Sequence, residues 1–123
     1  MAEYKLGRIE GIFADMIWDN APVTSRRLTE LAQERLHWKR TTTYTVLKRL
    51  CDRGLFRNDG SQVTALVSRE EFYARQSEQF VEETFHGSLP AFLAAFGSRK
   101  QLSDREIDQL QQLIDEMRRE SRG

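Results

Sequence analysis

The chain is poor in the residues that form disulfides, bind metals or cross membranes. It has one cysteine, Cys51, and two isolated histidines, His37 and His86, so neither a disulfide, a metal site nor a metal cofactor is expected. No stretch approaches the roughly 20 apolar residues that a membrane span needs. The first residues also lack an apolar signal run. We therefore expect a cytoplasmic protein without a membrane partner.

Catalytic motifs are missing as well. The sequence contains no glycine-rich phosphate loop, no nucleophile with a base at a recognisable spacing, and no carboxylate pair beyond ordinary surface charge. An enzyme is therefore not expected, and no organic cofactor is implied. The 123 residues suffice for one domain, or for one compact domain with an appendage.

Charge is balanced over the whole chain but unevenly placed. The formal net charge is +0, with 19 basic and 19 acidic residues. Residues 1–67 hold 11 Lys and Arg against 8 Asp and Glu, a net of +3, whereas residues 68–123 hold 8 against 11, a net of −3. This asymmetry predicts that only the first half meets a polyanion.

Residues 28–57 carry the most informative pattern, a helix, a short turn and a second helix that stops at Gly54. We expect this second helix over residues 41–53, with Thr41 or Thr42 as its N-cap. Its inner side is apolar, and its outer side carries hydroxyls, one aromatic ring and cations. Between residues 35 and 57 there are seven Lys or Arg and a single acid, Asp52. Such a surface suits the phosphates and base edges of a DNA major groove.

The flanking segments predict a winged helix-turn-helix domain over residues 1–70. Apolar residues at steps of three and four indicate a first helix over residues 6–18. After Gly54 the pattern changes to two short strands, residues 55–57 and 63–67, joined by a turn at residues 58–61. The expected fold class is therefore mainly α with a small β-hairpin. Trp18 and Trp38 are expected to pack in its core.

The candidate DNA-binding residues lie on and beside the second helix of the motif. Thr42, Tyr44, Thr45 and Lys48 are expected to reach bases or nearby sugars, and the flanking cations are expected to hold phosphates. Arg49 has an alternative role, because it could pair with Glu10 or Asp52 and hold the helix in place. The full set is Lys39, Arg40, Thr41, Thr42, Tyr44, Thr45, Lys48, Arg49 and Arg57.

The role of the hairpin stays open from the sequence. Its tip is short and slightly acidic, and Arg57 is its one good phosphate partner. A hairpin that covers the core explains the pattern as well as one that contacts DNA.

Residues 71–123 predict a helical dimerisation domain. Three helices with aromatic faces cannot easily bury every ring within so short a segment, so we expect an interface with a second copy of the chain. The alternative is packing onto the first domain. The expected interface residues are Phe72, Phe80, Phe85, Leu89, Phe92, Leu93, Phe96, Ile107, Leu110, Leu113 and Ile114.

The segment over residues 38–50, WKRTTTYTVLKRL, followed by Gly54, resembles the recognition helix of the penicillinase repressor family. Thr42, Thr45, Arg49 and Leu50 fall on matching positions. The resemblance continues through nearly the whole chain. Residues 6–18 are similar to the first helix of the family, and residues 76–85, 87–96 and 102–110 to its dimerisation helices.

The resemblance implies a dimeric repressor that binds a pseudo-palindromic operator in double-stranded DNA and blocks transcription. In the family, a sensor-linked protease pathway lifts repression by cutting an Asn-Phe bond in the dimerisation region. The matching dipeptide here is Ala95 and Phe96. The rival interpretation, from a different class, is a winged-helix module that binds protein without specific DNA binding.

Overall fold

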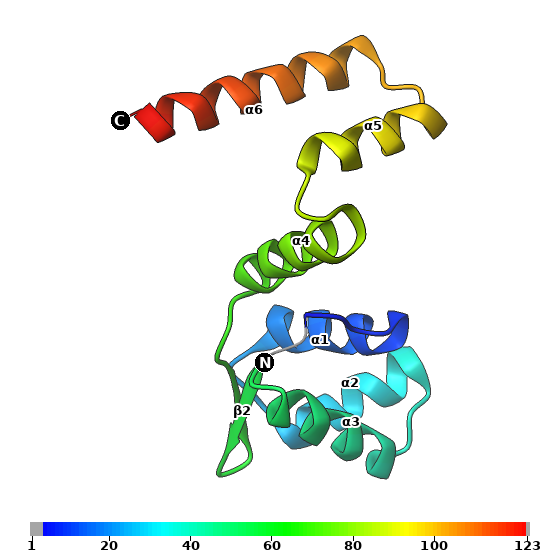
Figure 1. Ribbon diagram of the computed structural model, residues 1–123. Helices are drawn as coiled ribbons and strands as arrows, with labels where there is room; N and C mark the ends of the chain where they lie inside the picture. The colour runs from blue at the N-terminus through cyan, green and yellow to red at the C-terminus, as the bar shows by residue number, and fades with distance from the viewer. Residues whose placement is uncertain (1–3, 123) are drawn as a thin grey trace. The chain divides into compact units, whose positions relative to one another are not determined.

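The computed structural model describes residues 4–122 and contains six helices and three short strands (Figure 1). The mainly α class with a small β element is confirmed. The chain divides into two compact units, the first ending at Phe80 and the second beginning at Val81. The elements are α1 (Arg8–Asn20), β1 (Val23–Thr24), α2 (Ser25–Leu36), α3 (Arg40–Asp52), β2 (Phe56–Asp59), β3 (Gln62–Ala65), α4 (Arg69–Phe85), α5 (Leu89–Arg99) and α6 (Asp104–Arg122).

The start of α3 differs from the expectation. Its N-cap is Lys39, whose side chain makes no capping hydrogen bond, and Thr41 and Thr42 lie inside the first helical turn. The reason lies in the turn before it. His37 ends α2 in a left-handed conformation with φ of 57°, and the ring of Trp38 packs 5.2 Å from that of Phe13. Because this packing fixes Trp38, the next residue, Lys39, becomes the N-cap of α3.

The end of α3 follows the sequence prediction. Gly54 adopts a positive φ of 84°, a conformation that glycine enters without a Cβ penalty. Its N–H donates to the carbonyl of Cys51 at 2.9 Å, and the N–H of Leu55 donates to the carbonyl of Leu50 at 3.2 Å. Both leucines are buried. Together these bonds form a Schellman motif, which turns the chain from α3 toward the sheet.

The sheet has three antiparallel strands in the order β1-β3-β2, one more than the predicted hairpin. β1 consists of two residues, and Val23 pairs with Val63. So short a strand leaves no alternation that the sequence could reveal. The turn between β2 and β3 is formed by Gly60 and Ser61, which have φ of 57° and 67°. Positive φ at both central residues is typical of the type I′ hairpin turn.

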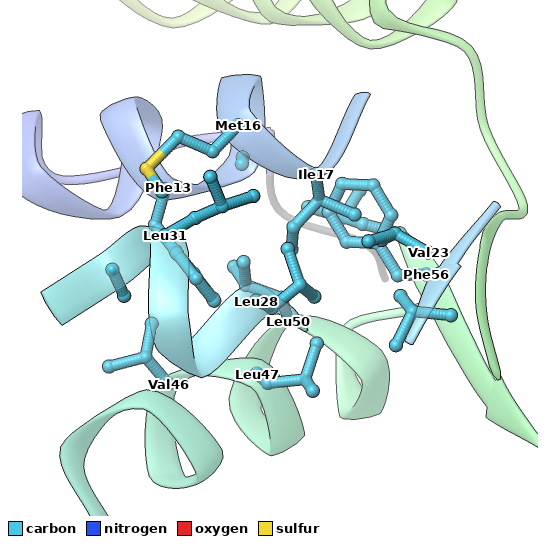
Figure 2. Packing of buried hydrophobic residues seen from close by; sticks show 14 of the residues in the cluster. Phe13, Met16, Ile17, Val23, Leu28, Leu31, Val46, Leu47, Leu50 and Phe56 are labelled. Carbon is cyan, nitrogen blue, oxygen red and sulfur yellow. The ribbon is translucent and has the colours of Figure 1, made fainter. Parts of the chain in front are cut away.

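The core of the first unit is formed mainly by side chains from α1, α2, α3 and the sheet. Figure 2 shows the side chains of α1, α2 and α3 converging, with Val23 and Phe56 contributed by the sheet. Trp18 and Trp38 pack against this cluster, as predicted. The buried apolar residues are Phe13, Ala14, Met16, Ile17, Val23, Leu28, Leu31, Ala32, Val46, Leu47, Leu50, Leu55, Phe56, Val63 and Phe72.

The first part of α4 belongs to the first unit. Phe72 is fully buried there, with its ring 5.6 Å from Trp18 and 5.7 Å from Tyr4. Its assignment to a dimer interface is therefore wrong, because a side chain enclosed by its own protomer has no surface to offer a second one. The first unit extends to Phe80 and so includes most of α4.

The second unit contains the rest of α4 with α5 and α6. Ser103 and Glu106 form a capping box at the start of α6: the N–H of Glu106 donates to the Ser103 hydroxyl at 3.1 Å, and the N–H of Ser103 donates to the Glu106 carboxylate at 3.4 Å. The rings of Phe85 and Phe92 meet edge to face at 5.6 Å. None of the helices within residues 4–122 has the length and apolarity needed to cross a membrane.

Candidate nucleic-acid interface

Helix α3 has two distinct faces. Its inner face carries Thr43, Val46, Leu47 and Leu50, which are buried. Figure 2 shows Val46, Leu47 and Leu50 on the side of α3 that faces α2. Its outer face carries the predicted contact residues, all of them exposed: Thr41, Thr42, Tyr44, Thr45, Lys48 and Arg49. The 3.6-residue period of the helix separates the two sets, and the packed inner face holds the outer face in place.

The threonine hydroxyls differ in what they can offer. The Thr45 hydroxyl donates to the carbonyl of Thr41 at 2.9 Å, and the buried Thr43 hydroxyl lies 3.3 Å from the carbonyl of Lys39. Because its proton is used within the helix, Thr45 presents oxygen lone pairs and a methyl group to the outside. Such a side chain accepts a hydrogen bond or contacts a thymine methyl.

Three of the predicted DNA-binding cations already have carboxylate partners. The ammonium of Lys48 lies 2.9 Å from Asp52, the guanidinium of Arg57 lies 3.6 Å from Asp59, and that of Arg49 lies 3.3 Å from Glu10. The alternative role for Arg49, pairing with Glu10, is thus seen in the structure. The hydrogen bond to Asp52 and its charge raise the pKa of Lys48, which keeps the ammonium protonated.

The pairing of Lys48 with Asp52 has a signal in the sequence, which is their spacing. Lys48 and Asp52 are four residues apart on one helix, a spacing that brings side chains together. Their side chains are 78% and 64% exposed, so this pair contributes little to folding stability. Its main effect is on the charge that the outer face presents.

Lys39 and Arg40 at the start of α3 differ from the other cations. Both are exposed, and within residues 4–122 neither forms an ion pair with a carboxylate. They line an open hollow of about 390 Å³ together with Gln33, His37 and Trp38. The absence of a side-chain cap leaves N–H groups of the first turn without a side-chain acceptor. Unpaired cations and free amides together make this end of the helix attractive to an anion.

The hairpin serves the core of the first unit. Phe56 of β2 and Val63 of β3 are almost fully buried, whereas the residues between them are exposed. The hairpin therefore covers the core, one of the two roles left open by the sequence. Contact between Arg57 and DNA stays a prediction.

The second unit displays most of the predicted interface residues on its surface. No residue between Val81 and Arg122 is buried. Leu89 is 58% exposed, Phe96 is 44% exposed and Leu113 is 48% exposed. A groove of about 330 Å³ runs between α5 and α6, and it is lined by Phe92, Leu93, Phe96, Leu102, Glu106, Gln109, Leu110 and Leu113. The remaining predicted interface residues of this unit, Phe85, Ile107 and Ile114, are half-buried or exposed, as is Phe80 in the first unit.

Two further features of the sequence have a defined place. Ala95 and Phe96, the dipeptide that the sequence resemblance matches to the family's cleavage bond, lie inside α5 with both side chains exposed. Cys51 is half-buried on α3, and burial raises the pKa of its thiol. Among the residues described, no group of three or more His, Cys, Asp or Glu is placed to hold a metal ion.

Comparisons with known proteins point to one family. The model of the penicillinase repressor family matches residues 6–116. The methicillin resistance regulatory protein MecI of Staphylococcus epidermidis is 22% identical over 115 residues, which cover 90% of this chain and 94% of that protein. Among solved structures, the crystal structure of the transcriptional regulator SlyA aligns with a TM-score of 0.43 and 22% identity, over 95% of this chain and 77% of that chain.

Proposed function

The chain belongs to the penicillinase repressor family, and from this premise we propose that it is a dimeric repressor that reads a pseudo-palindromic DNA operator and blocks transcription by occupying it. As a member of a family of transcriptional repressors, it is a DNA-binding regulator and not an enzyme. The observation that carries the proposal is the arrangement of α3. Its outer face exposes hydroxyls, Tyr44 and cations, and its inner face is packed in the core.

In the proposed complex, α3 lies in the major groove. Thr42, Tyr44, Thr45 and Lys48 reach bases or nearby sugars, and Thr41 lies on the same face. Lys39 and Arg40 hold a backbone phosphate at the uncapped start of the helix, where free amides add to their charge. Arg49 and Arg57 hold further phosphates.

Dimerisation supplies the second half of the proposed site. One recognition helix reads only a few base pairs, whereas two helices related by a dyad read two half-sites. The second unit supports a dimer because its apolar side chains, with Ile107, Leu113 and Ile114 each more than 40% exposed, are left uncovered in a single chain. A second copy would bury them.

Because cations of α3 and the hairpin form ion pairs, the salt dependence of DNA affinity shows which of these cations bind phosphate. If only Lys39 and Arg40 of each protomer bind phosphate, the slope of log K against log salt is about −4 for four contacts. If Arg49 and Arg57 also exchange their carboxylates for phosphates, the slope becomes about −7 for eight contacts. The slope therefore reports which ion pairs open on binding.

The proposal is tested by fluorescence anisotropy titration of the full chain against DNA from the region upstream of its own gene. A random sequence of equal length serves as control, and both are titrated at several salt concentrations. We expect the dimer to bind the upstream DNA at least about a thousandfold more tightly than random DNA.

Two other outcomes would count against the proposal. Weak binding with the same steep slope on both DNAs would mean that the basic helix binds DNA without reading an operator here. No binding to either DNA at low salt would instead favour the rival interpretation, a winged-helix module that binds a protein partner.

A further inference from the structure

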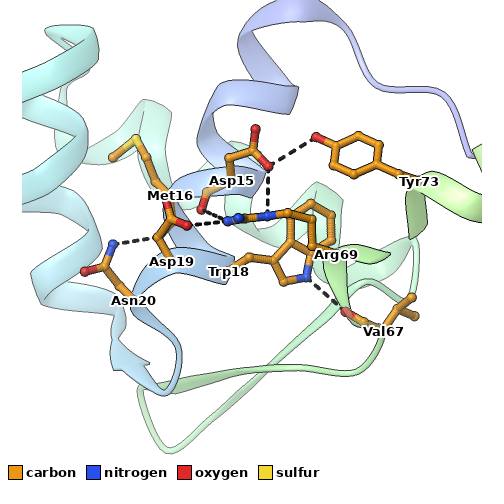
Figure 3. A network of polar contacts seen from close by, with 8 residues as sticks. All are labelled: Asp15, Met16, Trp18, Asp19, Asn20, Val67, Arg69 and Tyr73. Carbon is orange, nitrogen blue, oxygen red and sulfur yellow. Dashed lines mark hydrogen bonds and ion pairs between the residues drawn. The ribbon is translucent and has the colours of Figure 1, made fainter. Parts of the chain in front are cut away.

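The acidic side chains near the end of α1 join two helices of the first unit. The C-terminal end of a helix carries partial negative charge, so an acid there is unfavourable unless a cation offsets it. The guanidinium of Arg69, the first residue of α4, donates to the Asp19 carboxylate and lies 3.3 Å from the carboxylate of Asp15 (Figure 3). These two acids therefore attach the start of α4 to α1.

Asp52, the last residue of α3, has the same unfavourable place but a different kind of partner. Its carboxylate lies 2.9 Å from the ammonium of Lys48, which is one turn earlier on the same helix. The pair therefore joins no two elements of the fold. Its order is also the weaker one, because an acid stabilises a helix more when it precedes the lysine than when it follows it. Folding stability thus gives little reason for an acid at this position.

Two other acids lie beside predicted DNA-binding cations, and both differ from Asp52. The side chain of Glu10 is only 23% exposed, and besides binding Arg49 it accepts a backbone N–H at the start of α1, so it supports that helix. The carboxylate of Asp59 lies 3.6 Å from the guanidinium of Arg57, which is too far for a hydrogen bond. Of these three acids, Asp52 is the one that combines a hydrogen bond to its cation with a largely exposed position on α3.

The contact with Asp52 changes what Lys48 can bind. An ammonium has three N–H donors, and the hydrogen bond to Asp52 uses one of them. That bond and the charge of Asp52 raise the pKa of Lys48, so the ammonium stays protonated and keeps its two other donors. A phosphate is attracted by net charge, which the carboxylate offsets, whereas a base edge accepts hydrogen bonds from the remaining donors.

We propose that Asp52 is a positioning residue for Lys48, which keeps the ammonium from binding backbone phosphates and so directs it to a base edge of the operator. This inference rests on the proposed function. Its consequence is specificity. Every DNA offers phosphates, but only the operator offers the matching base edge. Asp52 therefore lowers the affinity for random DNA more than it lowers the affinity for the operator.

The test titrates full-length variants with operator and with random DNA of equal length, by fluorescence anisotropy at several salt concentrations. The operator is the sequence that the unaltered protein selects from a random pool. Asp52→Asn removes the charge and keeps the shape, whereas Asp52→Glu keeps the charge four residues from Lys48. Glu71→Gln is the matched control, because Glu71 also pairs with a cation four residues away, Arg75 of α4, and both residues lie outside the predicted DNA-binding set.

Asp52→Asn should bind random DNA about fivefold more tightly at low salt, because each protomer loses one like charge and releases one cation. On random DNA the slope of log K against log salt should steepen by about 1.8, since two ammonium groups per dimer each displace about 0.9 counterion. Operator affinity should rise by at most about twofold, so the preference for the operator should fall by more than about twofold. Asp52→Glu and Glu71→Gln should match the unaltered protein.

The double variant with Lys48→Ala shows whether Asp52 acts through Lys48. If it does, Asp52→Asn should raise the affinity for random DNA by less than about twofold when Lys48 is already absent, because no cation is left to release. An acid that only repels DNA would have the same effect with and without the lysine.

Three results would overturn the inference: equal gains on operator and random DNA in Asp52→Asn, an unchanged salt slope in that variant, or its full effect in the absence of Lys48. If Asp52→Asn does not fold, as judged by thermal unfolding, Asp52→Ser also lacks the charge and decides by the same criteria. Failure of the unaltered protein to select any operator would instead contradict the proposed function, and the two failures are thereby separated.

Discussion

Arg49 of α3 and Glu10 of α1 form an ion pair, with 3.3 Å between Nη1 and Oε2. The second oxygen of the same carboxylate accepts the N–H of Gly7 at 3.3 Å. Glu10 therefore supports the start of α1 and holds Arg49 at once. It also places a negative charge beside a surface proposed to meet phosphates, which lowers the attraction of that surface for any DNA.

Replacing Glu10 by Gln should release Arg49 for DNA. We expect random DNA to bind about three- to fivefold more tightly at low salt, because one like charge is removed and one cation gained. The loss of folding stability should stay below about 1 kcal/mol, as for other partly exposed pairs. Titration with random DNA measures the first effect and urea unfolding the second. Glu34→Gln is the control, since Glu34 is exposed on α2, and an equal gain in both variants would contradict a specific role for Glu10.

Replacing Lys48 by Ala should weaken operator binding with little loss of stability. Its side chain is exposed and its ion pair with Asp52 lies on the surface, so its loss should change the free energy of unfolding by less than about 0.5 kcal/mol. A lost base or phosphate contact should cost about 1–2 kcal/mol per protomer in binding. The measurement is a titration paired with thermal unfolding, with Lys100→Ala as a control for net charge. Unchanged operator affinity would mean that Lys48 is not one of the residues that contact DNA in the major groove.

Replacing Leu113 by Glu should yield monomers. Leu113 lines the groove between α5 and α6, and burying an unpaired carboxylate there would cost at least about 3 kcal/mol, more than a hundredfold in the dissociation constant. Light scattering during gel filtration measures the mass. Gln112→Glu adds the same charge at the adjacent position of α6, outside the residues that line the groove. If Leu113→Glu remains a dimer, this groove is not the interface.

The Tyr73 hydroxyl predicts a pH effect in the alkaline range. Burial, the charge of Asp15 and the hydrogen bond to Asp15 all raise the pKa of Tyr73. The folded state therefore favours the neutral phenol, while the unfolded chain ionises it from about pH 10. The stability that this group contributes is present below that pH and is lost as the pH rises through the folded-state pKa.

Comparing the unaltered protein with Tyr73→Phe isolates the pH-dependent contribution of the Tyr73 hydroxyl to folding stability. The difference in their free energies of unfolding should shrink between about pH 9 and pH 11, because only the unaltered protein loses the contribution of Tyr73. Urea unfolding followed by tryptophan fluorescence at several pH values measures it. A difference that stays constant over this range would mean that Tyr73 does not titrate differently in the two states.

The parts of this fold that the sequence predicted well depend on short-range pattern. The apolar steps of three and four residues located α1, α2 and α3, and Gly54 marked the end of α3. The same periodicity separated the outer residues of α3 from the inner ones without error.

Where prediction failed, distant residues decided the outcome. The N-cap of α3 is Lys39 rather than a threonine, because Trp38 is fixed against Phe13 of another helix. β1 forms because Val63 of a distant strand pairs with Val23. The sequence pattern placed Phe72 in the interface because a stripe of aromatic rings on a helix does not show whether the same chain or a second copy covers it.

The amino-acid sequence by itself determined the order of the helices and of the hairpin, the two faces of α3 and the family, because each of these depends on residue types at fixed local spacings. Only the tertiary structure decided which charges are paired and which are available. Arg49 meets Glu10 across 39 positions, and Arg69 meets Asp15 across 54. Such partners are set by how helices pack in space, which local periodicity does not encode.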